Sequence, residues 1–267
     1  SGRLGDGGIP DTNTNAPSTT AIDLGTGRTA VAVSAGGEHT CAILDNGDLK
    51  CWGRDYYGQL GDGGSNTNTN APSTTAIDLG TGRTAVAVDA GYYQTCAILD
   101  NGDLKCWGSD GHGQLGDGGP DWSNSNPTDT NAPSTTAIDL GTGRTAVAVS
   151  TGFHHTCAIL DNGESKCWGN NGDKQLGVGA STAYLTTPPI TAIDLGTGRT
   201  AVAISAESVN TCAILDNGEA RCWGYNAYGQ LGNGNNNAHD LPVSVFGNAW
   251  DSSTGLSSAS GGMTNVT

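Results

Sequence analysis

One string of seventeen residues, PSTTAIDLGTGRTAVAV, occurs three times in this chain without a single change. It covers 17–33, 72–88 and 133–149, and a shorter fourth copy, TAIDLGTGRTAVAI, covers 191–204. Each copy is followed by TCAILDNG and then CWG, and the first cysteines follow at intervals of 55, 61 and 55 residues (Cys41, Cys96, Cys157 and Cys212). A repeat of this kind restricts the chain to architectures in which one supersecondary unit packs on the next.

Each unit predicts four short strands. In the first unit these are 20–24, 29–34, 40–44 and 49–52, and the last two flank Asp45-Asn46-Gly47. Asn and Gly favour the tight turn of a hairpin because both residues tolerate positive φ. Alanines alternate with valines on the second strand, so we expect another backbone to approach it closely near a central axis.

Four strands per unit, repeated radially, predict an all-β fold, a β-propeller built from repeats of about 55 residues. Helical repeats are excluded because Gly-rich joints interrupt any apolar stripe with a period of 3.6 residues, Gly contributing 43 of the 267 residues. A β-solenoid is the alternative architecture, although its turns are usually shorter than such a repeat.

We treat the whole chain, 1–267, as a single array of repeats. The complete repeats are 16–70, 71–131, 132–186 and 187–240, while 1–15 is the trailing part of an incomplete blade and 241–267 the leading part of another. The extra residues of the second unit, around 121–126, mark an exposed loop. Between the two ends one cysteine hairpin is missing, which indicates a window from a longer array or a subunit whose end blades are completed elsewhere.

All eight cysteines occur in pairs with nine residues between them: Cys41/Cys51, Cys96/Cys106, Cys157/Cys167 and Cys212/Cys222. Around the Asp45-Asn46-Gly47 loop, Cys41 faces Cys51, and directly opposed cysteines lie within disulfide range. Zinc sites favour shorter spacings and a converging second pair. We therefore predict a disulfide in each hairpin and no metal site, and persistent disulfides predict an extracellular or cell-surface location.

The motifs that follow one another in each unit resemble a known family. Gly36-Gly37-Glu38-His39-Thr40, the Asn46-Gly47 hairpin, Trp52-Gly53 and Gly58-Gln59-Leu60-Gly61 are similar to the regulator-of-chromosome-condensation repeat. This resemblance implies a β-propeller, usually of seven blades. The founding members are nuclear exchange factors for a small GTPase that bind chromatin, but this chain is acidic and cysteine-paired, so we do not expect exchange-factor activity.

The charge of the chain excludes several classes of partner. Its formal net charge is −15, with only 11 Lys and Arg residues and a pI near 4.3. Nucleic-acid binding needs clustered cations that neutralise phosphates, so we expect no nucleic-acid partner. No apolar run approaches the ~20 residues that cross a bilayer, so we expect no membrane insertion.

The sequence offers no catalytic constellation. It has no Gly-x-Ser-x-Gly elbow, phosphate loop or metalloprotease helix. His39 and His155 occupy a repeat position that holds Gln94 and Asn210 in the other units, which is typical of a hydrogen-bonding position. We therefore predict no enzyme activity and no cofactor. Calcium is the alternative cofactor, because Asp-Gly loops offer oxygen ligands, although none of them matches a calcium motif.

Two hypotheses for function follow. We favour a structural protein that self-associates at the cell surface or in a filament, with copies of itself as partners, because near-identical blades suit lattice contacts. The alternative is a secreted module of inhibitor or adhesin type that binds an extracellular protein or glycan through its loops. The candidate partner contacts are Tyr56, Tyr57, Tyr92, Tyr93, Trp122 and Trp250.

Overall fold

The computed structural model describes residues 4–5, 20–119, 129–179 and 182–245, together with the backbone of 250–251 and 256–257. Every regular element in these ranges is a strand. The strands are β1 (Ala30–Ala35), β2 (His39–Leu44), β3 (Leu49–Gly53), β4 (Ala85–Ala90), β5 (Gln94–Leu99), β6 (Leu104–Gly108), β7 (Ala146–Thr151), β8 (His155–Leu160), β9 (Ser165–Asn170), β10 (Tyr184–Leu185), β11 (Ala201–Glu207), β12 (Asn210–Leu215), β13 (Ala220–Gly224), β14 (His239–Ser244), β15 (Trp250–Asp251) and β16 (Leu256–Ser257). In the part of the chain that is described, no helix has the length and apolar character to span a membrane.

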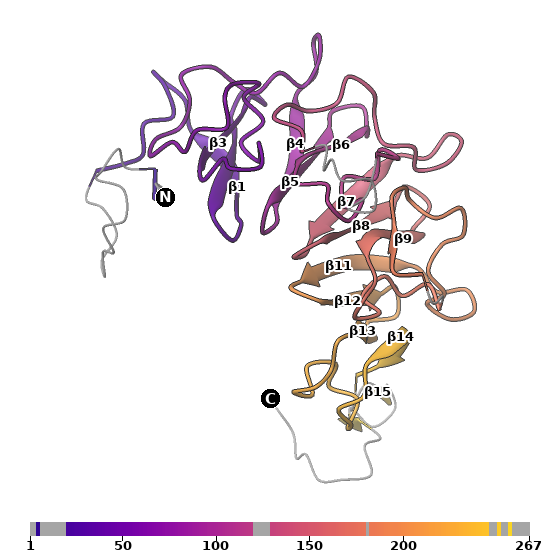
Figure 1. The fold of residues 1–267 in the computed structure, drawn as a ribbon. Coiled ribbons are helices and arrows are strands. Elements are labelled where there is room, and N and C mark those ends of the chain that lie inside the picture. Colours follow the sequence, from indigo (N-terminus) through magenta and orange to yellow (C-terminus); the bar gives the residue numbers. More distant parts are fainter. Residues whose placement is uncertain are drawn as a thin grey trace.

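The strands form one antiparallel sheet per repeat, which we call a blade. The orders are β1-β2-β3, β4-β5-β6, β10-β9-β8-β7 and β11-β12-β13-β14, and β15 pairs with β16. Isolated bridges, Gly53↔Thr69 and Gly108↔Thr130, take the place of a fourth strand in the first two blades. Innermost strands of successive blades lie side by side, and the blades follow one another along an arc (Figure 1).

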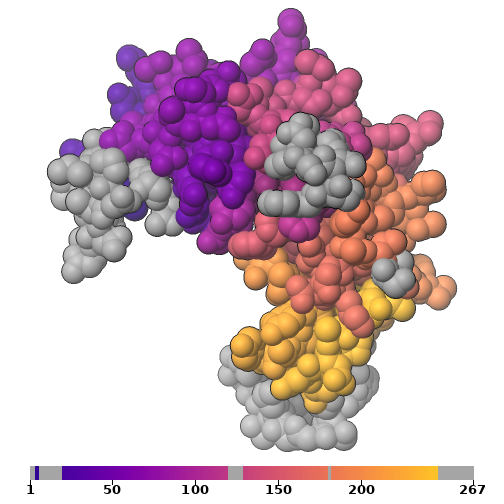
Figure 2. Space-filling view, viewed as in Figure 1, coloured from indigo at the N-terminus to yellow at the C-terminus, as the bar shows by residue number. Residues whose placement is uncertain are grey.

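Figure 2 shows the same arc in space-filling form, with the first blades (indigo to purple) and the last described strands (yellow) at its two ends. The predicted all-β propeller of disulfide-linked repeats is confirmed. Alanines of the innermost strands β4, β7 and β11 pack in the apolar clusters between blades, among them Ala85, Ala146 and Ala201.

The hairpin turn explains why each cysteine meets its partner. Gly47 adopts φ +81°, its N–H donates to the Leu44 carbonyl at 2.8 Å, and the Leu44 N–H donates to the Asp48 carbonyl at 2.8 Å. This turn sets the register Ile43↔Leu49 and Cys41↔Cys51. The structure links the cysteines as Cys41–Cys51, Cys96–Cys106, Cys157–Cys167 and Cys212–Cys222.

The prediction of a first strand at 20–24 is wrong. These residues form no strand, and neither do the equivalent segments in the other repeats. Each segment instead runs extended along a blade, attached for example by the Ile77 N–H, which donates to the Leu49 carbonyl at 2.9 Å. The fourth strand, where one exists, follows the Gln-Leu-Gly turn, as β10 and β14, and β14 extends past 240 into the segment predicted to be the leading part of an incomplete blade.

The hydrophobic core lies between blades rather than within them. The first cluster combines Cys41, Cys51 and Leu60 of the first blade with Ala90 and Trp107 of the second, and the same pattern recurs at the next two interfaces. Trp107, Trp168 and Trp223 are completely buried. A single blade would therefore expose the face that its neighbour covers, which is why such repeats are stable only when stacked.

One prediction concerns the contact between a Gly and this buried Trp. A Cβ added at Gly61 would lie 2.3 Å from Nε1 of Trp107, whereas a Cβ added at Gly63 meets nothing within 4 Å. Both glycines have a positive φ, of +70° and +69°. Gly63→Ala should therefore lower the free energy of unfolding by about 1 kcal/mol through backbone strain alone.

Gly61→Ala should lower it by about 2 kcal/mol more, because the buried indole has no room to move. Urea unfolding of the two variants beside the wild type measures the difference. Equal losses in the two variants would show that the glycine is needed only for its backbone conformation.

Candidate functional site

Aromatic side chains gather at the end of the blades where the innermost strand turns into the second strand. Tyr92 and Tyr93 lie in the turn between β4 and β5, and Phe153 and His154 lie in the turn between β7 and β8. The loops that follow β3 and β6 bring further rings to the same end. We call this set the aromatic face; it consists of Tyr56, Tyr57, Tyr92, Tyr93, His112, Phe153 and His154.

The rings of the aromatic face form one unbroken series of contacts across three blades. Centroid distances are 4.9 Å from Tyr56 to Tyr57, 4.7 Å from Tyr57 to Tyr93 and 4.5 Å from Tyr93 to Tyr92. The series continues from Tyr92 to Phe153 at 4.5 Å, then to His154 at 4.3 Å, and from His154 to His112 at 4.4 Å. Tilted and edge-on pairs at these distances stabilise one another, so the rings hold a fixed arrangement.

The aromatic face is accessible from outside. Tyr56 is 63% exposed and Tyr92 37% exposed, while Tyr57, Tyr93 and Phe153 are half-buried. Rigid rings that remain partly open to solvent can bury further area against a partner at a low cost in conformational entropy. A site of this kind is suited to binding rather than to bond-breaking chemistry.

The structure brings four of the six candidate contacts together in this face: Tyr56, Tyr57, Tyr92 and Tyr93. Trp122 lies outside the described residues, and of Trp250 only the backbone is described, in β15. Phe153, His154 and His112 join the face although they were not among the candidates. The signal was present in the sequence, because Phe153 stands at the repeat position of Tyr92.

Charged and titratable groups border the aromatic face. Arg54 forms an ion pair with Glu38 and lies over the ring of Tyr56, 5.5 Å from the centroid. Burial lowers the pKa of His154 to about 4, with a smaller contribution from His112, so this imidazole is neutral at pH 7. Burial also raises the pKa of Tyr93.

Beneath the face, one repeat position joins each blade to the next. Nε2 of His39 lies 2.7 Å from Oγ1 of Thr95, and Nε2 of His155 lies 2.9 Å from Oγ1 of Thr211. Gln94 at this position donates from Nε2 to the Gly152 carbonyl at 3.0 Å. The prediction of a hydrogen-bonding position is therefore confirmed, and burial explains why the pKa of His39 falls to about 4.

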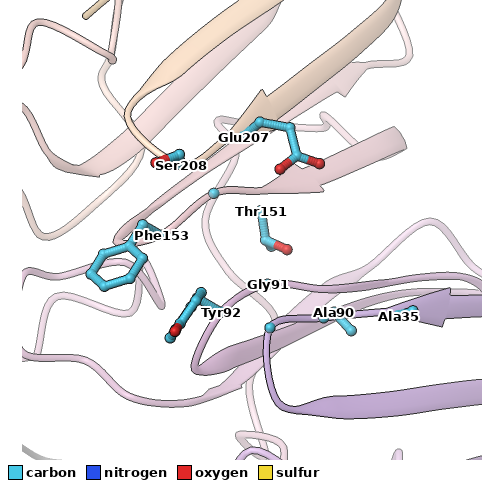
Figure 3. A pocket seen from close by; sticks show the side chains of 11 residues that line it. Ala35, Ala90, Gly91, Tyr92, Thr151, Phe153, Glu207 and Ser208 are labelled. Atoms are coloured by element: carbon cyan, nitrogen blue, oxygen red, sulfur yellow. The ribbon is translucent and has the colours of Figure 1, made fainter. Parts of the chain in front are cut away.

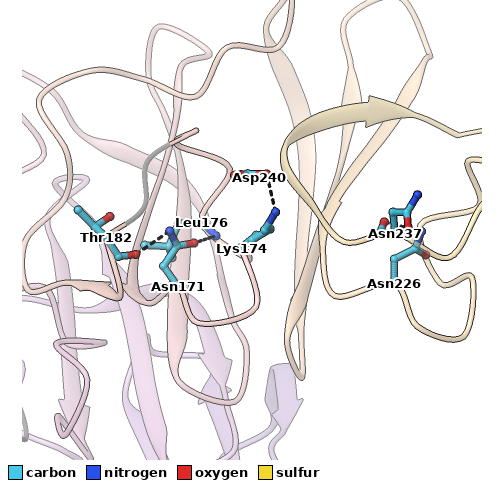
Figure 4. A network of polar contacts seen from close by, with 7 residues as sticks. All are labelled: Asn171, Lys174, Leu176, Thr182, Asn226, Asn237 and Asp240. Carbon is cyan, nitrogen blue, oxygen red and sulfur yellow. Dashed lines mark hydrogen bonds and ion pairs between the residues drawn. The ribbon is translucent and has the colours of Figure 1, made fainter.

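A second repeat position differs in charge between blades. Asp55, Asp110, Asn171 and Asn226 each accept the N–H of a leucine five residues later through their Oδ1 atom. The two asparagines also donate from Nδ2, Asn171 to the Thr182 carbonyl and Asn226 to the Asn237 carbonyl (Figure 4). In Asp55 and Asp110 the Oδ2 atom is buried without a hydrogen-bond partner among the described residues.

Burial raises the pKa of both carboxyl groups. Burial raises the pKa of Asp110 to about 7 against the effect of the hydrogen bond from Leu115, and the charges of Asp117 and Asp129 raise it further. The pKa of Asp55 rises to about 6, also through burial. Within the described ranges no three His, Cys, Asp or Glu side chains converge as a metal site.

The chain folds into successive antiparallel sheets, and each described blade has a disulfide-linked hairpin. It is therefore a repeat propeller that contains disulfides. The chain belongs to the regulator of chromosome condensation (RCC1) repeat family. One description of that repeat matches 30–59, 85–114, 146–175 and 201–230, and a second matches 46–98, 101–159 and 217–262.

The chain is similar in sequence to proteins with quite different names. The chain is 33% identical to the ultraviolet-B receptor UVR8 of Arabidopsis thaliana over 82% of its length and 46% of the receptor. It is 29% identical to the human E3 ubiquitin-protein ligase HERC2 over 79% of its length and 4% of the ligase. The chain thus spans less than half the length of either relative.

Solved structures share the fold at lower identity. Human WBSCR16 superposes with a TM-score of 0.75 at 22% identity, over 92% of this chain and 61% of that protein. Yeast RCC1 (Prp20) bound to Kap60 superposes with a TM-score of 0.68 at 17% identity, over 84% of this chain and 50% of that protein.

A second prediction tests the unpaired carboxylate. Asp110→Asn should raise the free energy of unfolding at pH 8 by on the order of 1 kcal/mol, because it removes a buried charge whose Oδ2 has no partner. A carboxyl whose pKa is raised by folding stabilises the fold as it takes up its proton. The advantage of the variant should therefore shrink as the pH falls through 7 toward 4.

Urea unfolding of wild type and variant at pH 8 and pH 5 measures this effect, and taking the difference at each pH cancels the titration of His39 and His155. Asp139→Asn, at an exposed turn position whose Oδ1 accepts the Gly141 N–H at 2.9 Å, is the control and should change little. A variant no more stable than wild type at pH 8 would contradict the prediction.

Proposed function

We propose that this chain is an extracellular, non-enzymatic binding module that engages a protein partner through its aromatic face. The observation that carries the proposal is the continuous series of seven rings across three blades, with Tyr56 and Tyr92 exposed. Tyrosine is enriched at the centres of protein interfaces because it combines a large apolar ring with a hydrogen-bonding hydroxyl. An apolar surface of this kind, kept by a soluble domain, is typical of an interaction site.

The distribution of sequence differences supports the same function. The strands and hairpins are nearly identical from repeat to repeat, whereas the loop residues at the aromatic face differ. Tyr56-Tyr57 of the first repeat corresponds to Gly111-His112 in the second, and Tyr92 to Phe153. A recognition site needs such local differences, since identical blades would offer the same surface several times.

The proposed location rests on the disulfides. Each described hairpin contains one, and the structure has no free cysteine among its described residues. Disulfides persist in oxidising compartments and are rare in the cytosol. Secretion or surface display suits a module whose net charge of −15 favours solubility.

A third prediction follows for partner capture. Full-length protein should retain specific proteins from the culture medium and surface extract of the organism that produces it. The double variant Tyr56→Ser/Tyr92→Ser should retain at least about tenfold less, because two exposed anchor rings are lost. Tyr228→Ser, which removes a ring that is 88% exposed on the fourth blade, is the matched control and should retain as much as wild type.

Quantitative mass spectrometry of the captured proteins provides the readout. Retention that does not depend on the two tyrosines, or no specific retention at all, would exclude the aromatic face as the binding site. Retention that survives protease treatment of the extract but not periodate oxidation would identify a glycan instead of a protein.

Self-association is a second candidate function, favoured by apolar side chains that are exposed on one face of the first blade and one face of the fourth blade. Inside the arc, an isoleucine face of one blade packs on a valine face of the next, as Ile43 and Val88 do. At the ends these positions are open: Val33 is 70% exposed, and Ile214 is 48% exposed although its equivalent Ile159 is 2% exposed. The two faces are the halves of one interface, so a second copy could stack its first blade on the fourth blade in a head-to-tail manner.

A fourth prediction addresses this candidate. Light scattering of the non-reduced protein should show assemblies that grow with concentration, and negative-stain microscopy should show filaments or closed rings. Val33→Asp should abolish them, because it places a charge on the uncovered face. Val202→Asp, at a position that is 61% exposed on an inner strand, should leave them intact. Monodisperse monomers at every concentration would eliminate a structural, self-associating role.

A further inference from the structure

A hollow of about 420 Å³ opens beside the aromatic face, where four blades meet. Its walls are the turns that join the innermost strands to the second strands. These turns are Gly36-Gly37, Gly91-Tyr92, Gly152-Phe153 and Glu207-Ser208. Figure 3 shows that the rings of Tyr92 and Phe153 form one side of this hollow and that the carboxylate of Glu207 points in from the other side, toward Thr151.

The fourth turn departs from the pattern of the other three. Those turns begin with a glycine, and a Cβ added at Gly36 or Gly152 would lie 2.2 Å from another atom. The fourth turn has Glu207 at this position, and its side chain is exposed. Ser208 has a φ of +41°, a left-handed conformation that is unfavourable for a residue with a side chain. Strained residues of this kind are concentrated at ligand sites.

The electrostatics of the hollow favour a cation. No Lys or Arg is among its lining residues. Asp89 lies next to the lining residue Thr151 and accepts hydrogen bonds from its N–H at 2.6 Å and from its hydroxyl at 2.7 Å. The other oxygen of Asp89 accepts the Ser34 hydroxyl at 3.2 Å, and among the described residues no Lys or Arg forms an ion pair with this carboxyl group, whose pKa is raised by burial. Glu207 adds a second carboxylate at the rim.

The two aromatic rings provide the remaining half of a cation site. Their centroids lie 4.5 Å apart, and the planes are tilted by 46°. The face of an aromatic ring attracts a cation, and a planar guanidinium can stack on it while its N–H groups donate to a carboxylate opposite. An ammonium group is smaller and more strongly hydrated, so it would use this arrangement less fully.

We infer that this hollow receives an arginine side chain of the protein partner, with the guanidinium against Tyr92 and Phe153 and paired with Glu207. This inference rests on the proposed function, because it names the chemistry that the partner presents beside the aromatic face. It identifies the partner as a protein with a basic, exposed segment. The acidity of the whole chain would speed the encounter with such a segment.

The test is an NMR titration of the full ¹⁵N-labelled chain with the peptide acetyl-Gly-Ser-Arg-Ser-Gly-amide. The amide signals of Gly91, Gly152 and Ser208 should shift in a saturable manner. The same peptide with citrulline, which has the shape of arginine but no charge, should bind at least about tenfold more weakly. The lysine peptide should bind with intermediate affinity.

Variants identify the groups that recognise the cation. Glu207→Gln should weaken binding of the arginine peptide by about fivefold or more, because it removes the paired charge. Glu164→Gln removes the same charge from an exposed hairpin turn at the other end of β8 and should change the affinity by less than about twofold. Phe153→Leu should weaken binding while keeping the apolar volume.

Several results would overturn the inference. These are equal binding of the arginine and citrulline peptides, an affinity unaffected by Glu207→Gln, or no shift at the three amides at any peptide concentration. Loss of partner capture in Tyr56→Ser/Tyr92→Ser together with such a result would leave the proposed function standing and remove only the arginine site. Saturable binding of the arginine peptide without tyrosine-dependent capture would leave the arginine site standing and remove only the proposed function.

Discussion

The carbonyl of one glutamine in each repeat is the contact on which the arrangement of the blades depends. The Gln59 carbonyl accepts the indole N–H of Trp107 at 3.1 Å and the hydroxyl of Thr95 at 2.8 Å, both from the next blade. The carbonyls of Gln114 and Gln175 bind the following blades in the same way. These donors are buried, so each would be costly to leave unpaired, and the contact therefore orients one sheet on the next while the cysteines and leucines fill the space between them.

Although this contact is repeated, the loops at the rim differ between repeats, apart from the glycine that begins three of the turns. The aromatic face and the hollow beside it lie on turns that the strands position but do not specify. Tyr92 and Phe153 occupy the same repeat position in neighbouring blades, and the spacing between blades is what brings their rings together. A rigid repeated frame that carries variable loops is a common way to build a recognition surface.

Much of this fold could be predicted from local sequence, and the errors have a physical cause. The Asp45-Asn46-Gly47 turn was sufficient to place Cys41 opposite Cys51, since a tight turn determines the register of its hairpin. The prediction of a strand at 20–24 failed because Ile22 and Leu24 are two residues apart, as apolar residues are on the buried side of a strand. The equivalent Ile77 and Leu79 are indeed buried, but against a neighbouring blade, where the segment needs almost no ladder of hydrogen bonds. Alternating apolar and polar residues indicate that one side of a segment is buried. They do not indicate that the segment pairs with another strand.

The repeat, the disulfide-linked hairpins, the all-β class and the family follow from the sequence, because all of these depend on residues close together in the chain. The tertiary structure alone decided which side chains form a site. Tyr57 meets Tyr93, and Glu207 lines the same hollow as Tyr92 and Phe153, only because successive blades rotate about a common axis and bring turns from different repeats to one rim. The same holds for Asp110, whose charge looks ordinary in the sequence and becomes unfavourable only once the fold removes its Oδ2 from water.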